Sequence, residues 1–170
     1  MNIDEIIDAY YQKVYKLCLF YLKDREEAEE ILQEVFIKIV KKQKDFKGQS
    51  DIYTWIYRIA VNTLLNYIKR KKLVEFISFE GLTKTTRVSM EKSGRDPAEV
   101  LEENQIQKQE IEKLETCIAL LSHREKTAFY FFHYDQLKQK EIARIMKTSV
   151  PAVESLIHKA MKKLKRCVGT

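Results

Sequence analysis

The chain has 170 residues, 45% hydrophobic and 33% charged, so it can bury the cores of one domain or of two small ones. With only 4 Gly and 2 Pro, the composition excludes a turn-rich β fold and favours long helices. The net charge of +6 favours a polyanionic partner without specifying nucleic acid. No stretch suits a membrane span or a signal peptide, so we expect no membrane insertion and a cytoplasmic protein.

Apolar residues recur at three- and four-residue steps in two early segments, from Ile3 to Tyr21 and from Ala28 to Val40. This spacing predicts two amphipathic helices. Asp24 and Glu27 have capping-box spacing and predict where the second helix begins. The polar side of the second helix mixes acidic and basic residues, and such a surface is by default only solvated.

Residues 46–72 predict a third helix with two different sides, one of them an apolar stripe that includes Trp55. The other side carries Arg58, Asn62 and Lys69, and two tyrosines that we expect to be exposed, Tyr53 and Tyr57, lie on its flank. Exposed rings can stack on bases and cations can follow phosphates, which suits an unpaired nucleic-acid strand. Aromatic residues at helical spacing are also common in cores, and basic residues at a helix end are also common as solvated caps. Both interpretations stay open on these residues alone.

Helical periodicity stops after Lys72. Residues 73–95 mix Ser, Thr, Lys and Gly around an apolar patch at 76–79, so we expect a flexible linker whose patch is a short strand or a partner-binding segment. Residues 96–99, Asp-Pro-Ala-Glu, predict a new helix start, and Ser122 with Glu125 predicts another. A short helix at 140–146, a turn at 147–149 and a basic helix at 151–166 have the pattern of a helix-turn-helix.

The three cysteines, Cys18, Cys117 and Cys167, are widely separated and form no C-x-x-C pair. This spacing predicts neither a disulfide framework nor a zinc site, and Cys18 and Cys117 fall where apolar residues recur, which favours simple burial of reduced thiols. The histidines show no ligand spacing with the cysteines, and no phosphate loop or catalytic pairing is present. We therefore expect no metal, no cofactor and no enzymatic activity.

The run Phe46-Lys47-Gly48, followed by YTWIYRIAVNT at residues 53–63, resembles the promoter-melting helix of bacterial RNA polymerase sigma factors. The resemblance is closest to the extracytoplasmic-function (ECF) group of the sigma-70 family. Residues 28–38 resemble the sigma segment that docks on the clamp helices of the polymerase β′ subunit. Residues 121–164 resemble the sigma module that reads the −35 promoter element.

This resemblance implies an all-α protein of two small helical domains joined by a flexible linker. Residues 1–72 would form the sigma region 2 bundle of three to four helices, residues 73–95 the linker, and residues 96–170 the sigma region 4 helix-turn-helix. Such a factor binds core RNA polymerase through the β′ clamp helices and the β flap. It then directs promoter-specific initiation by recognising −35 duplex and melted −10 DNA. The partners implied are core polymerase, promoter DNA and an anti-sigma factor.

Site residues follow from the resemblance position by position. The polymerase contacts are Gln33, Glu34, Ile37 and Lys38. The contacts with melted −10 DNA are Phe46, Tyr53, Tyr57, Arg58, Asn62, Lys69 and Arg70. The contacts with −35 DNA are Ser149, Ala152, Glu154, Ser155, His158, Lys159 and Lys162. Phe46 and Asn62 are expected at a pocket for a flipped base, where the Asn62 amide can read a base edge, whereas Trp55 is assigned to the core.

The recognition region departs from the family pattern at several positions. Lys147 and Pro151 stand where glycine is frequent, and Glu154 stands where a basic residue is common. Directed into the groove, Glu154 could accept a hydrogen bond from cytosine N4. Lys138 replaces the usual serine cap and should weaken that helix start by up to about 1 kcal/mol. The promoter sequence of relatives therefore does not carry over to this chain.

Two other functions compete with this interpretation. A helix-turn-helix regulator could bind duplex DNA without docking on polymerase, but it has no need for the string at residues 55–62. An enzyme domain with a helical appendage is opposed by the absence of any recognisable catalytic site in the sequence.

Overall fold

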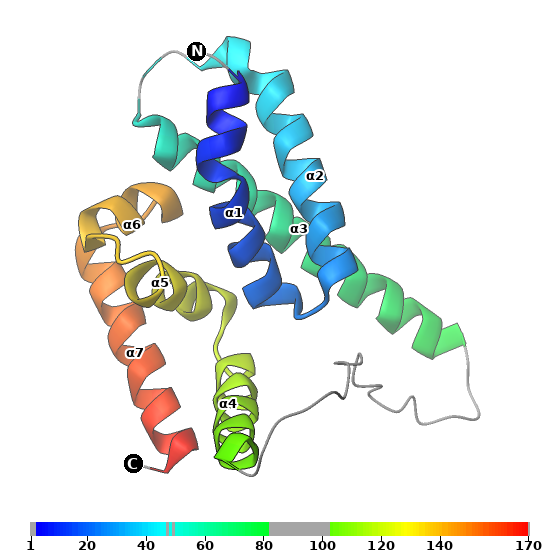
Figure 1. The fold of residues 1–170 in the computed structure, drawn as a ribbon, viewed down its shortest axis with the longest axis vertical. Helices are drawn as coiled ribbons and strands as arrows, with labels where there is room; N and C mark the ends of the chain where they lie inside the picture. Colours follow the sequence, from blue (N-terminus) through cyan, green and yellow to red (C-terminus); the bar gives the residue numbers. More distant parts are fainter. Residues whose placement is uncertain (1–2, 47, 49, 82–102, 170) are drawn as a thin grey trace. The chain divides into compact units, whose positions relative to one another are not determined.

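The structure is a computed structural model that describes residues 3–46, 48, 50–81 and 103–169. Within these residues the chain forms seven α-helices, one 3-10 turn and no strand (Figure 1). It divides into two compact units, Met1–Gly94 and Arg95–Thr170. The prediction of an all-α fold with two helical domains is confirmed.

The N-terminal unit contains α1 (Ile3–Leu22), α2 (Arg25–Lys42), the 3-10 turn η1 (Gln43–Asp45) and α3 (Ile52–Gly81). α1 and α2 pack along each other, and α3 packs against both (Figure 1). Asp24 opens α2 as predicted, because its side chain accepts a hydrogen bond from the Glu27 N–H at 2.9 Å. The fully buried side chains come from all three helices and include Val14, Leu17, Ala28, Val35, Ile56, Ala60 and Leu64.

α3 is longer than the sequence predicted. The helix continues through Leu73 and Phe76 to Gly81, so the expectation that a linker begins at residue 73 is wrong, and so is that of a strand at 76–79. Leu73, Val74 and Phe76 are 58%, 62% and 59% exposed. Side chains that stay largely exposed need no apolar stripe, so residues 73–76 show no helical period. The rest of the predicted linker and the helix start at residues 96–99 lie outside the described residues.

The C-terminal unit contains α4 (Glu103–Ala119), α5 (His123–His133), α6 (Gln139–Met146) and α7 (Val150–Val168). α7 is its central element and packs against α4, α5 and α6. Ser122 and Glu125 form the predicted capping box at the start of α5. The buried side chains include Phe131, Ile142, Val153, Ile157, Ala160 and Leu164.

The cysteines differ from the sequence-based expectation. Cys117 of α4 and Cys167 of α7 form a disulfide with a Cα–Cα distance of 5.7 Å. The expectation of a reduced protein without a disulfide is therefore wrong, although Cys117 is buried as predicted. The two residues are 50 positions apart, and they meet only because the ends of α4 and α7 lie together. Cys18 is a buried free thiol, as expected. Its burial raises the pKa of the thiol to about 12, which makes it unreactive at neutral pH.

Candidate polymerase and DNA interfaces

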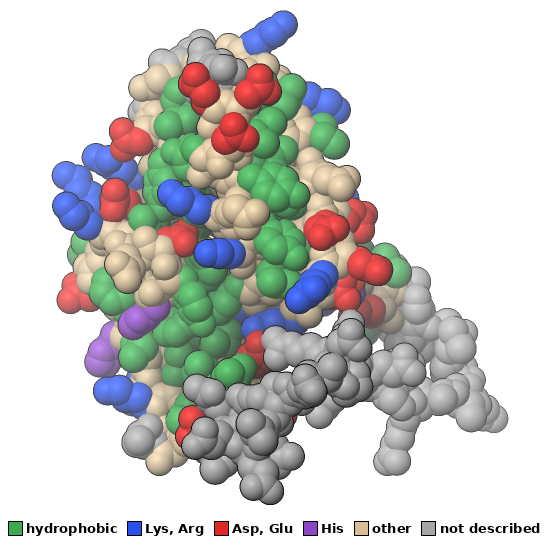
Figure 2. Space-filling model, viewed as in Figure 1, with side chains coloured by type: hydrophobic (Ala, Val, Ile, Leu, Met, Phe, Trp, Pro, Cys, Tyr) green, Lys and Arg blue, Asp and Glu red, His purple; other side chains and the backbone are tan. Residues whose placement is uncertain are grey.

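The outer side of α2 carries the four candidate polymerase contacts. Gln33 and Ile37 are exposed, and Ile37 presents 53% of its surface. Glu34 and Lys38 are half-buried and joined by a 2.6 Å ion pair, and Lys38 Nζ also donates to Thr63 Oγ1 of α3 at 3.2 Å. On the face shown in Figure 2, exposed apolar side chains lie between charged ones over α1 and α2. α2 therefore offers an apolar contact at Ile37 beside charged groups that α3 holds in place.

One ion pair joins a candidate polymerase contact to a candidate DNA contact. Arg70 Nη2 of α3 lies 3.7 Å from Glu34 Oε2 of α2. Because the Arg70 side chain is 65% exposed, this pair contributes at most about 1 kcal/mol to stability. Lys71 pairs in a similar way with Glu27. Arg70 and Lys71 of α3 are thus oriented by acidic residues of α2, while Arg70 stays largely open to solvent.

The polar side of α3 lies largely outside the bundle. Asn62, Lys69 and Arg70 are exposed, whereas Arg58 is half-buried. Asn62, Lys69 and Arg58 recur at helical spacing and share one side. On other sides Ile56, Ala60 and Leu64 are completely buried. The side chains that could meet a nucleic-acid strand are therefore separated from those that hold the bundle.

Tyr53 and Tyr57 differ in their burial, and the expectation that both are exposed is wrong. Tyr57 has no exposed surface, and Tyr53 is half-buried between Tyr57 and Tyr10, with ring centroids 4.6 Å and 6.3 Å away. Tyr57, Val61 and Leu64 form a second buried row on α3, because α3 packs on both α1 and α2. Tyr57 therefore belongs to the core, and its ring cannot stack on a base in this conformation.

The loop before α3 places an aromatic pair at the end of the bundle. The half-buried Phe46 packs against the half-buried Trp55, with ring centroids 5.1 Å apart. Gly48 has a φ of +68°, a conformation that strongly favours glycine and lets the chain bend before α3. Trp55 therefore contributes to packing, but it is half-buried and not part of the core to which the sequence assigned it, and it orients Phe46.

A tight turn joins α6 to α7. Lys147 ends α6 in the left-handed conformation, with φ 49° and ψ 53°, where glycine would be unstrained. Ser149 caps α7, because its Oγ accepts from the Ala152 N–H at 3.3 Å. At the other end of α6, the Lys138 side chain provides no cap, and only the Glu141 carboxylate accepts from the Lys138 N–H, at 2.8 Å. An ammonium group has no acceptor, so half of a capping box remains.

The candidate −35 contacts share the outer side of α7. Most of them are exposed, and Ala152 is half-buried. Ser155, Lys159 and Lys162 follow one another at helical spacing and form the centre of this side. Glu154 lies about 100° around the helix from Ser155, so it faces the flank. Inward-facing Val153, Ile157 and Ala160 fix α7 in the unit and leave this outer side free of core packing.

The buried carboxylate of Glu125 joins α5 to α7 through a contact that the sequence did not predict. Glu125 is 5% exposed, and its Oε2 accepts from the Ser122 N–H at 2.9 Å and from Lys163 Nζ at 2.7 Å. Burial alone would raise the pKa of this carboxyl, but the bonds from Lys163 and Ser122 outweigh burial and leave the pKa lowered. The capping-box spacing indicated Ser122, but nothing in the sequence indicated Lys163.

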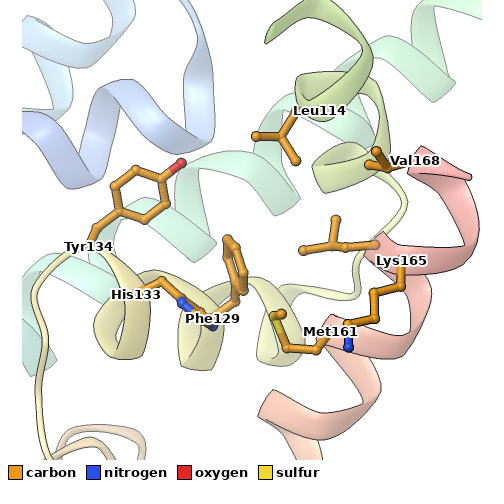
Figure 3. Close-up of a pocket in the computed structure, with 8 residues that line it drawn as sticks. Leu114, Phe129, His133, Tyr134, Met161, Lys165 and Val168 are labelled. Carbon is orange, nitrogen blue, oxygen red and sulfur yellow. The ribbon is translucent and has the colours of Figure 1, made fainter. Parts of the chain in front are cut away.

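An apolar pocket of about 340 Å³ opens between α4, α5 and α7. Figure 3 shows Leu114 of α4, Phe129 of α5 and Val168 of α7 around a common space. Tyr134, which is 54% exposed, lies at its edge, and burial raises the pKa of its hydroxyl. Most of the lining is apolar, and His133 and Lys165 are its polar members.

The described part of the chain contains no group of three or more His, Cys, Asp or Glu side chains that could hold a metal ion. Within the same residues, none of the helices combines the length and the apolar character that crossing a membrane requires.

Comparison with known families matches both units. The sigma-70 region 2 family matches residues 6–74, and the sigma-70 region 4 family matches residues 111–164. The first match covers α1, α2 and most of α3, and the second covers the helix-turn-helix. A region 2 bundle and a region 4 helix-turn-helix on one chain define an RNA polymerase sigma factor.

Similar proteins show to which group of sigma factors the chain belongs. The ECF RNA polymerase sigma factor SigW of Bacillus subtilis is 29% identical over 168 residues, which cover 95% of this chain and 86% of that protein. The ECF RNA polymerase sigma-E factor of Haemophilus influenzae is 31% identical over 159 residues, covering 91% and 81%. The chain belongs to the ECF group of RNA polymerase sigma factors. A regulator that binds duplex DNA without polymerase docking is not favoured, because region 2 is present.

A solved structure shares the fold. The sigma factor RpoE of Bartonella quintana, in complex with the anti-sigma factor NepR, gives a TM-score of 0.72 at 17% identity and covers 97% of this chain and 95% of that one. At this identity the likeness concerns the fold alone.

Proposed function

We propose that the outer side of α3 captures the melted non-template strand of the −10 element. Opening DNA costs about 1.4 kcal/mol per base-pair step, and each base that is stacked or held in a pocket returns about 1–3 kcal/mol. Phe46 and Asn62 hold a flipped base, and Arg58, Lys69 and Arg70 bind phosphates. The observation that carries this proposal is the exposure of Asn62, Lys69 and Arg70 on a helix whose inner side is buried against α1 and α2.

The same bundle docks on core polymerase through α2. Gln33 and Ile37 make direct contacts with the β′ clamp helices, since they are the exposed members of the set. Glu34 and Lys38 contribute charge in positions that their contacts with α3 define. In the C-terminal unit, the apolar pocket between α4, α5 and α7 suits a partner helix, and we assign it to the β flap.

The outer side of α7 reads the −35 duplex. Ser155 is the central candidate for a base contact, flanked by Ala152 and His158, and Ser149 adds a hydroxyl at the helix start. Lys159 and Lys162 bind phosphates, which gives affinity that depends on salt. The flanking position of Glu154 suits recognition of a cytosine at the edge of the site.

The experiment that tests the α3 assignment replaces Asn62 by alanine. Because Asn62 is exposed, Asn62→Ala should leave folding and core-polymerase affinity within about twofold of wild type. It should reduce promoter opening about tenfold, as expected for a base contact worth roughly 1–3 kcal/mol. Opening is measured by permanganate reactivity of unpaired thymines, and affinity by titration with core polymerase.

Asn66→Ala is the matched control, because Asn66 is also exposed and lies one turn further along α3. It should leave both measurements unchanged. If both variants lost promoter opening equally, the cause would be a general effect on the α3 surface and not the loss of a specific base contact. Equal loss of opening and polymerase affinity in Asn62→Ala would make the residue structural.

We also propose that an anti-sigma factor binds and inhibits this protein. The related factor from Bartonella quintana is bound by NepR, and the same kind of inhibitor would cover the polymerase-binding surfaces of this chain. We place the protein in the cytoplasm, where core polymerase works. The chain isolated from its native cells should carry an inhibitor, and removing that inhibitor should raise transcription in vitro. Full activity of the native complex before its removal would contradict this part.

A further inference from the structure

α4 is weakly held in the C-terminal unit apart from one covalent bond. Of its side chains that the structure describes, at residues 109–119, only Cys117 and Ile118 are buried, at 1% and 2% exposure. Leu114 remains 39% exposed. An exposed hydrogen bond of 2.7 Å joins Lys113 Nζ to the Val168 carbonyl oxygen. The disulfide therefore replaces the apolar packing that usually fixes a helix of this length.

We propose that Cys117 and Cys167 form a reversible thiol–disulfide switch that fastens α4 to α7. This inference rests on the cytoplasmic function proposed above, because that compartment keeps thiols reduced and the disulfides that form there are usually transient and redox-sensing. The two residues also differ in exposure: Cys167 is half-buried, whereas Cys117 is almost completely covered. One reachable and one covered cysteine suit the roles of attacking and resolving thiol.

The oxidant is a hydroperoxide. The Cys167 thiolate attacks the outer oxygen, the O–O bond breaks, and the alcohol or water leaves with the proton of the former thiol. Cys167 is then a sulfenic acid. The Cys117 sulfur displaces its oxygen, the S–O bond breaks as the S–S bond forms, and water leaves. The cysteines lose two electrons, which the hydroperoxide gains. Reduction takes two exchange steps. An external thiolate first attacks Cys167, with Cys117 as the leaving group, and a second external thiolate then attacks the external sulfur of this mixed disulfide and releases Cys167.

The switch acts on the pocket rather than on the recognition helix. Leu114 lies three residues before Cys117 on α4, and Val168 directly follows Cys167 on α7. Both side chains line the pocket (Figure 3). When the disulfide is reduced, α4 is no longer covalently held against α7. Leu114 then moves with α4 and no longer lines the pocket. The first half of α7 stays fixed, because Val153, Ile157 and Ala160 remain packed within the unit. Oxidation therefore completes the partner-binding pocket, and reduction leaves the helix-turn-helix folded.

The test uses the full chain, treated with hydrogen peroxide or with a glutathione buffer at a cytosolic ratio. Alkylation followed by intact-mass measurement should show the bond closing with peroxide and opening in glutathione. Amide hydrogen exchange in residues 109–119 should be about tenfold faster after reduction, while exchange in residues 150–160 changes less than about twofold. Cys117→Ser and Cys167→Ser should match the reduced protein under both conditions.

Cys18→Ala is the matched control, because this thiol is buried in the other unit and should not affect the response. A bond that glutathione cannot open is structural and would overturn the switch. Equal exchange of α4 in both states would overturn the fastening role. Transcription with core polymerase is measured separately: a redox-responsive chain that initiates nowhere would count against the proposed function and leave the switch standing.

Discussion

Replacing Glu125 should destabilise the C-terminal unit far more than an ordinary surface substitution. Glu125→Ala removes the acceptor for the Ser122 N–H and the partner of Lys163. A lost cap bond costs about 0.5–2 kcal/mol, and a lost charge-assisted bond about 1.5–3 kcal/mol. The Lys163 side chain is 48% exposed, so it returns to water without a large additional cost. We expect a total loss of about 2–5 kcal/mol in this unit.

The same carboxylate should give the unit an acid-sensitive stability. Because the folded pKa of Glu125 is lowered, its ionised form contributes stability that is fully present above the unfolded pKa of about 4.3. That contribution is lost as the pH falls through the folded pKa. Glu125→Gln keeps an amide oxygen for Ser122 but cannot take up this proton. It should be less stable than wild type at neutral pH and should lack this part of the acid dependence.

Hydrogen exchange of amides in α5 and α7 measures these changes, since slow exchange reports the free energy of opening. Trp55 is the only tryptophan and lies in the N-terminal unit, so its fluorescence during denaturation provides an internal control that should not change. The reasoning is refuted if Glu125→Ala exchanges like wild type at pH 7, or if Glu125→Gln retains the full acid dependence.

Three further substitutions test other parts of the structure. Lys147→Gly should stabilise the C-terminal unit by about 1 kcal/mol in the same exchange measurement, because φ is 49° at this residue; Lys147→Ala, which keeps a Cβ, should not. Tyr57→Ala should cost the N-terminal unit about 3–5 kcal/mol by Trp55 fluorescence, because the ring is fully buried; a stable variant defective only in promoter melting would contradict its core role. Lys162→Ala should weaken binding to all −35 duplexes about equally and lower the slope of log affinity against log salt by about 1, and an unchanged slope would remove Lys162 from the phosphate contacts.

The helices and their inner sides could largely be predicted from the sequence, because burial of one side imposes a period that is visible in the residues. Asp24 and Ser122 marked helix starts correctly for a similarly local reason: a cap involves residues only three positions apart. The errors on α3 have a common cause. Tyr57 is buried because α3 packs on two helices, whereas residues 73–76 of the same helix are exposed. A single-helix pattern assumes one partner and so misjudges both cases.

The contacts that the sequence did not predict all depend on two helices at once. Glu34 meets Arg70, Glu125 meets Lys163, and Cys117 meets Cys167. Periodicity shows which side of a helix is buried, but the residue it meets depends on how far one helix is shifted along another. This shift follows from the packing of whole side-chain rows, which no local spacing encodes. Candidate DNA contacts on one helix could therefore be named from sequence, whereas the ion pair that orients Arg70 and the bond that fastens α4 required the folded chain.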